Sequence, residues 1–202
     1  PEAQIANMGI QSGFHHRGIR FPSIAARDEL IEAVRQADIV GFNTIVESAC
    51  ALTERVFSAY DIEPMLIFEA NIRRVIMFSQ KEKFMAMLQG RKVLLIGSLA
   101  PIMKSKLEWK YRRKYQCDIV GAISIHEYEE IARVKDEIQH YEFDLCLLAA
   151  GVNAVILASY IAQSCGKVAF DMGSGLTSLM TGEIVMDQWL AYIIGLDKLF
   201  KM

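Results

Sequence analysis

Four short segments of the sequence carry residue types that bind phosphates and sugars, and each follows an apolar run typical of a buried strand. Glycine lets a ligand approach the backbone closely, whereas serine, asparagine and aspartate supply hydroxyl, amide and carboxylate groups. Because ligands of open parallel sheets bind beyond the carboxyl ends of the strands, these segments are the candidate sites. They are residues 41–44, 97–101, 149–153 and 171–175.

The segment 97–101 leads from a predicted strand into a predicted helix, and Pro101 suits the first turn of that helix. The missing side chain of Gly97 would open the backbone to a ligand, and a helix N-terminus carries partial positive charge. Together with the hydroxyl of Ser98, these features suit a diphosphate. The segment has neither the ending of a Walker A loop nor the spacing of a dinucleotide fingerprint, so a plain strand-to-helix turn is the alternative.

A carboxylate stands at a predicted strand end in the segment 171–175. Asp171 is predicted to bind a sugar hydroxyl or to act as a general base, and an aspartate that caps a turn is the alternative. In the segment 149–153, Gly151 and Asn153 combine a close-approach glycine with an amide, although asparagine is also an ordinary helix cap. The predicted ligand-binding residues of the four segments are Asn43, Gly97, Ser98, Gly151, Asn153, Gly173 and Ser174.

Alternating strands and helices must position these segments. Such alternation with short connections predicts an α/β, Rossmann-like fold, which is a mostly parallel sheet with helices on both faces. Apolar runs predict strands at 38–42, 92–97, 118–123, 144–149 and 167–171, with a short strand near 18–21. Helical periodicity predicts helices from residue 25, over 44–60, over about 69–88, from 101, from 128 and over 153–164, with capping boxes at 44–47 and 124–127.

Composition limits the class of protein. The 202 residues are 52% hydrophobic and carry a formal net charge of -2, which excludes an intrinsically disordered chain and argues against a nucleic-acid partner. We expect one domain over residues 1–185. The apolar tail, residues 186–202, is expected to dock on the core or on a second copy as a homodimer.

The sequence disfavours both a membrane span and secretion. The uncharged stretch 145–166 is long enough to cross a bilayer, but it divides into a buried strand and a buried helix around a glycine-bearing turn. The sequence shows no basic-then-apolar leader, and its four cysteines form no CxxC pair. We therefore expect reduced thiols in a cytoplasmic protein without a transmembrane span.

Four stretches of the sequence carry a family resemblance. They are Ala37-Asp-Ile-Val-Gly-Phe, Gly90-Arg-Lys-Val-Leu-Leu-Ile-Gly, Phe143-Asp-Leu-Cys-Leu-Leu-Ala-Ala-Gly-Val-Asn-Ala-Val-Ile-Leu-Ala and Gly166-Lys-Val-Ala-Phe-Asp-Met-Gly. In this order they resemble bacterial GT-D-type glycosyltransferase domains over roughly residues 1–180. The resemblance implies a Rossmann-like sheet that transfers a sugar from a nucleotide-sugar, typically a UDP-sugar, to a glycan or protein-linked acceptor.

The resemblance also implies site residues. The family's metal motif is an Asp-x-Glu whose Glu matches Glu2, while its Asp would precede the first residue of this sequence. Glu2 would hold a divalent metal, Mn²⁺ or Mg²⁺. Glu2 and Asp171 are the two candidates for the catalytic base. Ser174 stands where the family has a histidine. The residues of the N-terminal loop that could close over donor or acceptor are His15, His16 and Arg17.

Three other functions stay open. A relative with a degenerate metal motif would bind a nucleotide or sugar without turning it over. A Rossmann-like methyltransferase would need an acidic residue just after its second strand, and the strand 118–123 has no acid after it before Glu127. A structural assembly protein would use the apolar tail, and light scattering would reveal it.

Overall fold

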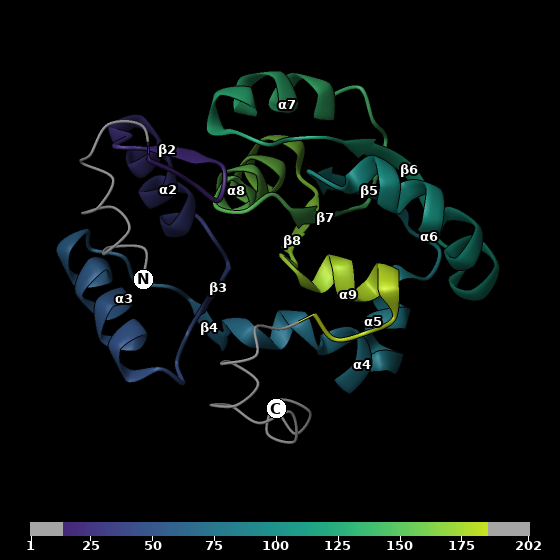
Figure 1. Ribbon diagram of the computed structural model, residues 1–202, viewed down its shortest axis with the longest axis horizontal. Helices are drawn as coiled ribbons and strands as arrows, with labels where there is room; N and C mark the ends of the chain where they lie inside the picture. The colour runs from purple at the N-terminus through teal and green to yellow at the C-terminus, as the bar shows by residue number, and fades with distance from the viewer. Residues whose placement is uncertain (1–13, 186–202) are drawn as a thin grey trace.

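A four-stranded parallel sheet lies at the centre of the computed structural model, which describes residues 14–185 except for the side chains of 14–16, 109–111 and 114–115. Its strands are β5 (Lys92–Gly97), β6 (Asp118–Ile123), β7 (Leu145–Ala149) and β8 (Val168–Asp171). The spatial order of the strands is β6-β5-β7-β8 (Figure 1). After β5 the chain adds β6 on one side of β5, and it then adds β7 and β8 on the other side of β5. The carboxyl ends of β5 and β7 therefore form the topological switch point, where open α/β sheets bind ligands.

Two hydrophobic cores cover the two faces of this sheet, because successive side chains of a strand point to opposite faces. Val93 and Leu95 pack into one core, and Leu94 and Ile96 pack into the other. The first face is covered by α4 (Ile76–Ser79), α5 (Lys81–Leu88), α6 (Ala100–Tyr115) and α9 (Gly175–Thr181), and the second by α7 (Ile131–Ile138) and α8 (Asn153–Cys165). Helices on both faces explain why the central strands are continuously apolar.

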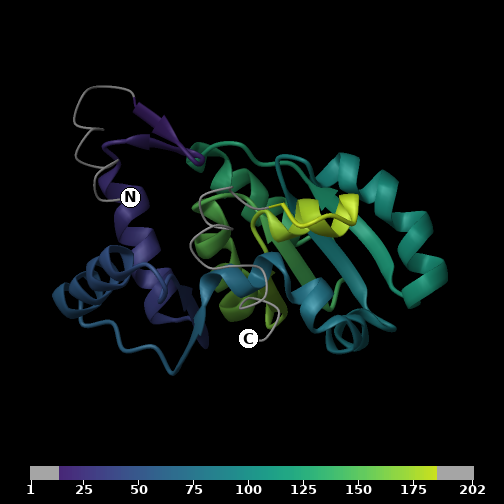
Figure 2. The ribbon, with the colours of Figure 1, turned by 60° about the horizontal axis from the view of Figure 1, so that its bottom comes forward.

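The N-terminal part of the described chain lies at the end of the molecule opposite α6 (Figure 2). It contains an antiparallel hairpin of β1 (Phe14–His16) and β2 (Ile19–Phe21), helix α2 (Ile24–Arg35), a parallel pair of β3 (Ile39–Phe42) and β4 (Leu66–Glu69), and helix α3 (Glu47–Ala59). Two 3-10 helices complete the fold, η1 (Ala70–Arg74) after β4 and η2 (Tyr128–Glu130) before α7. Helix α2 is tied to α8, since the side-chain amide of Gln163 donates to the carbonyl of Gln36 at 3.3 Å.

The Rossmann-like α/β fold is confirmed, but one predicted helix is wrong. Residues 69–88 form the end of β4, η1, α4 and α5 in place of a single helix. The apolar run that ends at Glu69 pairs in parallel register with β3. The Glu69 side chain then accepts from the N–H of Asn71, which starts the 3-10 turn and ends the strand. Helix α9 was not predicted, because its seven residues follow a glycine-rich turn.

Both predicted capping boxes are also wrong. The hydroxyl of Thr44 donates to Oε2 of Glu69 at 2.7 Å, and α3 begins only at Glu47 without a side-chain cap. The second capping box lies further along the chain, where Glu127 and Glu130 cap η2 reciprocally. At the first place Oδ1 of Asn43 accepts from the N–H of Val46, while the Thr44 hydroxyl is committed to Glu69. At the second place a carboxylate oxygen of Glu130 accepts from the N–H of Glu127, and hydrogen bonds to a charged group are the stronger ones.

The strand predicted at 38–42 does not join the main sheet. It forms β3 and pairs only with β4, so the segment 41–44 lies at the end of a separate two-stranded sheet. The other three candidate segments follow β5, β7 and β8 and share one edge of the main sheet. Within residues 14–185 no helix has the length and apolarity to span a membrane, and the uncharged stretch 145–166 forms β7 and α8.

Candidate functional site

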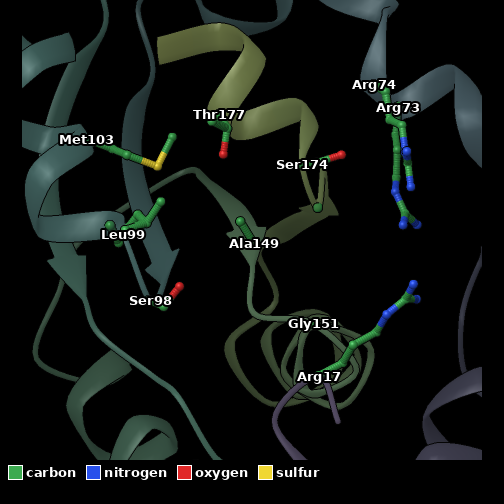
Figure 3. A pocket seen from close by; sticks show the side chains of 12 residues that line it. Arg17, Arg73, Arg74, Ser98, Leu99, Met103, Ala149, Gly151, Ser174 and Thr177 are labelled. Carbon is green, nitrogen blue, oxygen red and sulfur yellow. The ribbon is translucent and has the colours of Figure 1, made fainter. Parts of the chain in front are cut away.

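A pocket of about 320 Å³ opens at the carboxyl ends of β5, β7 and β8, at the switch point of the sheet. Pockets of this size hold small-molecule ligands. Figure 3 shows two chemically different sides, with arginines on one and the apolar start of α6 on the other. The lining residues are Arg17, Arg73, Arg74, Ser98, Leu99, Ala100, Met103, Ala149, Gly151, Gly173, Ser174 and Thr177.

Three guanidinium groups form the cationic side of the pocket. Arg17 comes from the turn between β1 and β2, and Arg73 and Arg74 come from the end of η1. In Figure 3, Arg17 extends toward the other two arginines from the opposite direction, so that all three border the same space. A guanidinium group presents several N–H donors in a planar fork that matches phosphate oxygens. This side of the pocket therefore suits a phosphorylated ligand.

The opposite side of the pocket is apolar and belongs to the start of α6. Met103 is buried there, while Leu99 leaves 43% of its surface exposed. The first N–H groups of a helix have no partner within the helix, so the beginning of α6 also offers backbone donors to an anion. A ligand that joins an anionic group to an apolar or ring-shaped group would contact both sides.

Asp171, the last residue of β8, holds Arg73 at the pocket. Its Oδ2 lies 3.6 Å from Nη1 of Arg73, and its Oδ1 accepts a hydrogen bond from the N–H of Gly173 at 2.9 Å. Burial raises the pKa of the Asp171 carboxyl, and the Arg73 charge and the Gly173 hydrogen bond oppose that rise. Asp171 does not itself line the pocket. Its contribution to the pocket therefore passes through Arg73 and the turn at Gly173.

Glu69 anchors the element that carries the two neighbouring arginines. This buried carboxylate accepts from the N–H and the side-chain amide of Asn71 at 2.9 and 2.5 Å. It also accepts from the N–H and the hydroxyl of Thr44 at 2.6 and 2.7 Å. Both carboxylate oxygens are thus occupied, which offsets the cost of burying the charge. The hydrogen bonds fix the start of η1, and with it the position of Arg73 and Arg74.

Glycines allow the backbone segments around the pocket to approach one another. A Cβ on Gly97 would collide with the backbone of β7, and a Cβ on Gly175 would collide with the carbonyl of Arg73. Gly151 has a φ of 60°, and a Cβ there would lie 2.5 Å from the carbonyl oxygen of Arg17. The last two close approaches let the arginine-bearing segments pack against the turn after β7 and the start of α9. At Gly97, the missing side chain makes room for β7.

A comparison with protein families identifies this architecture. A family model described as the GT-D fold-like domain matches residues 2–179. The chain belongs to this family. All lining residues of the pocket fall within the match, and the family is glycosyltransferase-related. No curated protein matches the chain significantly. The pocket is therefore the candidate substrate site of a GT-D-like domain.

Several predicted ligand-binding residues line the pocket of this GT-D-like domain. They are Ser98, Gly151, Gly173 and Ser174. Arg17, from the loop predicted to close over a ligand, lies there too, whereas the side chains of His15 and His16 are outside the described part of the structure. Glu2 and the tail 186–202 also lie outside the described residues. Their predicted roles stay predictions.

Two predicted residues have other hydrogen-bonding tasks. Oδ1 of Asn43 accepts from the N–H groups of Ile45 and Val46 at 3.1 and 3.0 Å, which shapes the turn before α3. Asn153 is fully buried, and its side-chain amide donates to the carbonyl of Gly18 at 3.2 Å. Asn153 therefore fastens α8 to the β1–β2 hairpin. Neither asparagine is a lining residue of the pocket, and neither is Gly97.

Sequence reasoning missed the two arginines of η1 and Thr177. Arg73 and Arg74 were placed inside the helix predicted at 69–88, which hid their position after a strand. The signal was present, because an apolar run of strand length follows Pro64 and precedes Glu69 and Asn71. Had the run been assigned as a strand, the arginines that follow it would have been placed at a strand's carboxyl end.

The described residues do not fit a divalent metal in this pocket. Within residues 14–185 no group of three or more His, Cys, Asp and Glu side chains could hold an ion. Mg²⁺ and Mn²⁺ favour carboxylate and other oxygen ligands. The lining, as far as the structure describes the chain, has three guanidinium groups and no carboxylate. The guanidinium groups suit an anionic ligand.

Proposed function

We propose that this GT-D-like chain is a glycosyltransferase that takes a sugar from a nucleotide-sugar, with UDP-sugars the first candidates, and passes it to a glycan or protein-linked acceptor. One observation carries the proposal, which is the convergence of Arg17, Arg73 and Arg74 on a pocket at the switch point of the sheet. The departure of a nucleoside diphosphate develops negative charge, and donors already in place stabilise it.

The two sides of the pocket support one orientation of the donor. The diphosphate would face the arginines and the start of α6, while the base or the sugar would lie against Leu99 and Met103. Hydroxyl groups of Ser98, Ser174 and Thr177 also line the pocket. They can donate to and accept from the hydroxyls of a ribose or of the transferred sugar.

The proposed transfer makes one bond at the anomeric carbon and breaks another. The acceptor oxygen bonds to that carbon while the bond from the carbon to the phosphate oxygen breaks, and its electron pair stays with the diphosphate. The acceptor's proton passes to a base, for which Asp171 and Glu2 are the candidates from the sequence. Asp171 does not line the pocket, so it would reach the acceptor only after leaving its contacts with Arg73 and Gly173. Burial raises the pKa of Asp171, which makes its carboxylate a better proton acceptor than an exposed one.

Release of UDP from a panel of UDP-sugars, with and without sugar acceptors, tests the proposal. We expect turnover by the wild-type chain, and we expect Arg73→Ala to lower kcat/KM on the order of tenfold to a hundredfold, because charge-assisted hydrogen bonds to the diphosphate are lost. The control is Arg55→Ala, because Arg55 is exposed on α3 and does not line the pocket. Equal kcat/KM for the two variants would contradict the proposal.

A donor-binding relative without catalysis is the second candidate. The absence of a metal-ligand group among residues 14–185 favours it, since the resemblance implies a metal-assisted reaction. Such a protein would bind a UDP-sugar and release no UDP, so the same assay separates the two functions. For either one we propose a cytoplasmic location, which is supported by the free thiols of all four cysteines.

A further inference from the structure

Guanidinium groups supply the charge of the described pocket lining. Arg17, Arg73 and Arg74 line the pocket, and the lining residues that the structure describes include no acidic side chain. Charges interact strongly where protein atoms replace water, so these guanidinium groups attract an anion.

Two carboxylates next to η1, which carries Arg73 and Arg74, are already engaged. Asp171 pairs with Arg73 at 3.6 Å and accepts from the N–H of Gly173 at 2.9 Å. Glu69 is buried and accepts hydrogen bonds at both of its oxygens from Thr44 and Asn71. Both groups therefore serve to hold the arginine side in place. Recruiting either as a metal ligand would release the element that it fixes.

Two polar atoms of the lining residues lack partners. Nε of Arg73 and Oγ of Ser174 are buried, and neither makes a hydrogen bond within the described residues. A buried donor without a partner costs free energy, and each such group in a folded protein calls for an explanation. Both residues line the pocket. Each of the two residues therefore keeps a polar atom that no described residue satisfies.

We propose that guanidinium groups replace the divalent cation in this pocket, so that the diphosphate of a nucleotide-sugar binds to Arg73, Arg74 and Arg17 without a bridging metal. The inference rests on the proposed donor site and adds how its charge is neutralised. It differs from the Mn²⁺ or Mg²⁺ dependence that the family resemblance implies. The planar fork of an arginine can take two phosphate oxygens, which a point charge cannot orient in the same way.

Calorimetric titration of UDP tests this inference on the wild-type chain. One titration contains EDTA and a second contains Mn²⁺, with Mn²⁺ and UDP also titrated without protein. We expect UDP to bind in EDTA, with a Kd within about twofold of that in Mn²⁺, and to bind more weakly as the salt concentration rises. Binding that appears only with Mn²⁺ would overturn this inference and leave the donor site standing. No binding of UDP under either condition would overturn both.

Variants identify the groups that bind UDP in EDTA. We expect Arg73→Ala to raise the Kd on the order of tenfold, and Arg73→Lys, which keeps the charge but loses the fork, to raise it by a smaller factor. Arg55→Ala is the matched control and is expected to leave the Kd unchanged. A Kd in EDTA that is the same for Arg73→Ala and Arg55→Ala would also overturn the inference, provided that both variants show the wild-type circular dichroism spectrum.

Discussion

The contact between Asp171 and Arg73 links the end of the sheet to the cationic side of the pocket. The carboxylate is mostly buried, and the guanidinium group at 3.6 Å and the N–H of Gly173 only partly offset the loss of water. The same residue was predicted from the sequence as a ligand contact or base. Its position shows a second role, which is to hold Arg73 at the pocket.

The free energy of unfolding should depend on pH because the pKa of Asp171 is raised in the folded chain. Because burial raises this pKa above the ordinary value of 3.8, the folded chain binds the proton more tightly than the unfolded chain. The protonated Asp171 carboxyl therefore contributes its full stabilisation of the folded chain below the pKa that Asp171 has in the unfolded chain. This stabilisation is lost as the pH rises through the pKa of Asp171 in the folded chain. Asparagine does not titrate, so the free energy of unfolding of wild type relative to Asp171→Asn should fall between about pH 3.5 and about pH 7.

Urea denaturation of both chains at the two pH values measures this difference. A difference that grows with pH would show that the Arg73 charge, and not burial, dominates the pKa of Asp171.

Sugar transfer by Asp171→Asn tests the catalytic assignment of the same residue. We expect kcat to fall on the order of a hundredfold or more if the carboxylate accepts the proton, because an amide cannot do so. A role limited to positioning Arg73 would appear mainly as a higher KM for the donor. Unchanged kcat and KM would exclude both roles.

At the scale of elements, the packing of η1 against α9 decides where the arginines lie. Gly175 begins α9, and a Cβ there would collide with the carbonyl of Arg73. We expect Gly175→Ala to push η1 away, to lower the free energy of unfolding by about 1–3 kcal/mol and to weaken UDP binding.

A matched control for this substitution is Gly182→Ala. Gly182 has a φ of 80°, and no atom lies within 4 Å of the Cβ that it would gain. The variant should lose about 1 kcal/mol through backbone strain alone and keep the UDP affinity of the wild type. Denaturation and calorimetry measure both quantities. Equal UDP affinity for the two variants would mean that the contact between η1 and α9 does not position the arginines.

Sequence periodicity could predict the main sheet because its strands are buried on both faces and its helices have long apolar stripes. The region 69–88 could not be assigned in the same way, since its short elements are set by the tertiary hydrogen bonds of Glu69. The strand-end rule led to Ser98 and Ser174, and both residues line the pocket. It could not place Arg73, because the element that carries it was assigned to a helix.

At the scale of the whole molecule, the N-terminal part and the main sheet are joined by specific hydrogen bonds. The N–H of Tyr128 donates to the carbonyl of Gly18 at 2.7 Å, and Arg20 pairs with Glu127 at 3.0 Å. Together with the contact between α2 and α8, these bonds place Arg17 at a pocket whose other lining residues belong to η1, α6, α9 and the strand ends of the main sheet. The described pocket is therefore complete only when both parts are folded, whereas the single domain over residues 1–185 stays a prediction.

Hydrogen exchange measured by mass spectrometry tests this coupling. We expect the amides of α2 and α8 to open with the same free energy, because the two helices would unfold together. Opening of α2 at a clearly lower free energy than α8 would show that the N-terminal part unfolds by itself. If the two helices unfold together, UDP binding should slow the exchange of the amides of α2 as well as those of α8, since Arg17 lines the pocket.

The most direct test of the donor site is a crystal structure of the chain with UDP bound. We predict that the diphosphate lies between the carboxyl ends of β5 and β7, with its oxygens within hydrogen-bond distance of the Arg73 guanidinium group. UDP bound at another place, or bound in the pocket with its diphosphate turned away from the arginines, would contradict it.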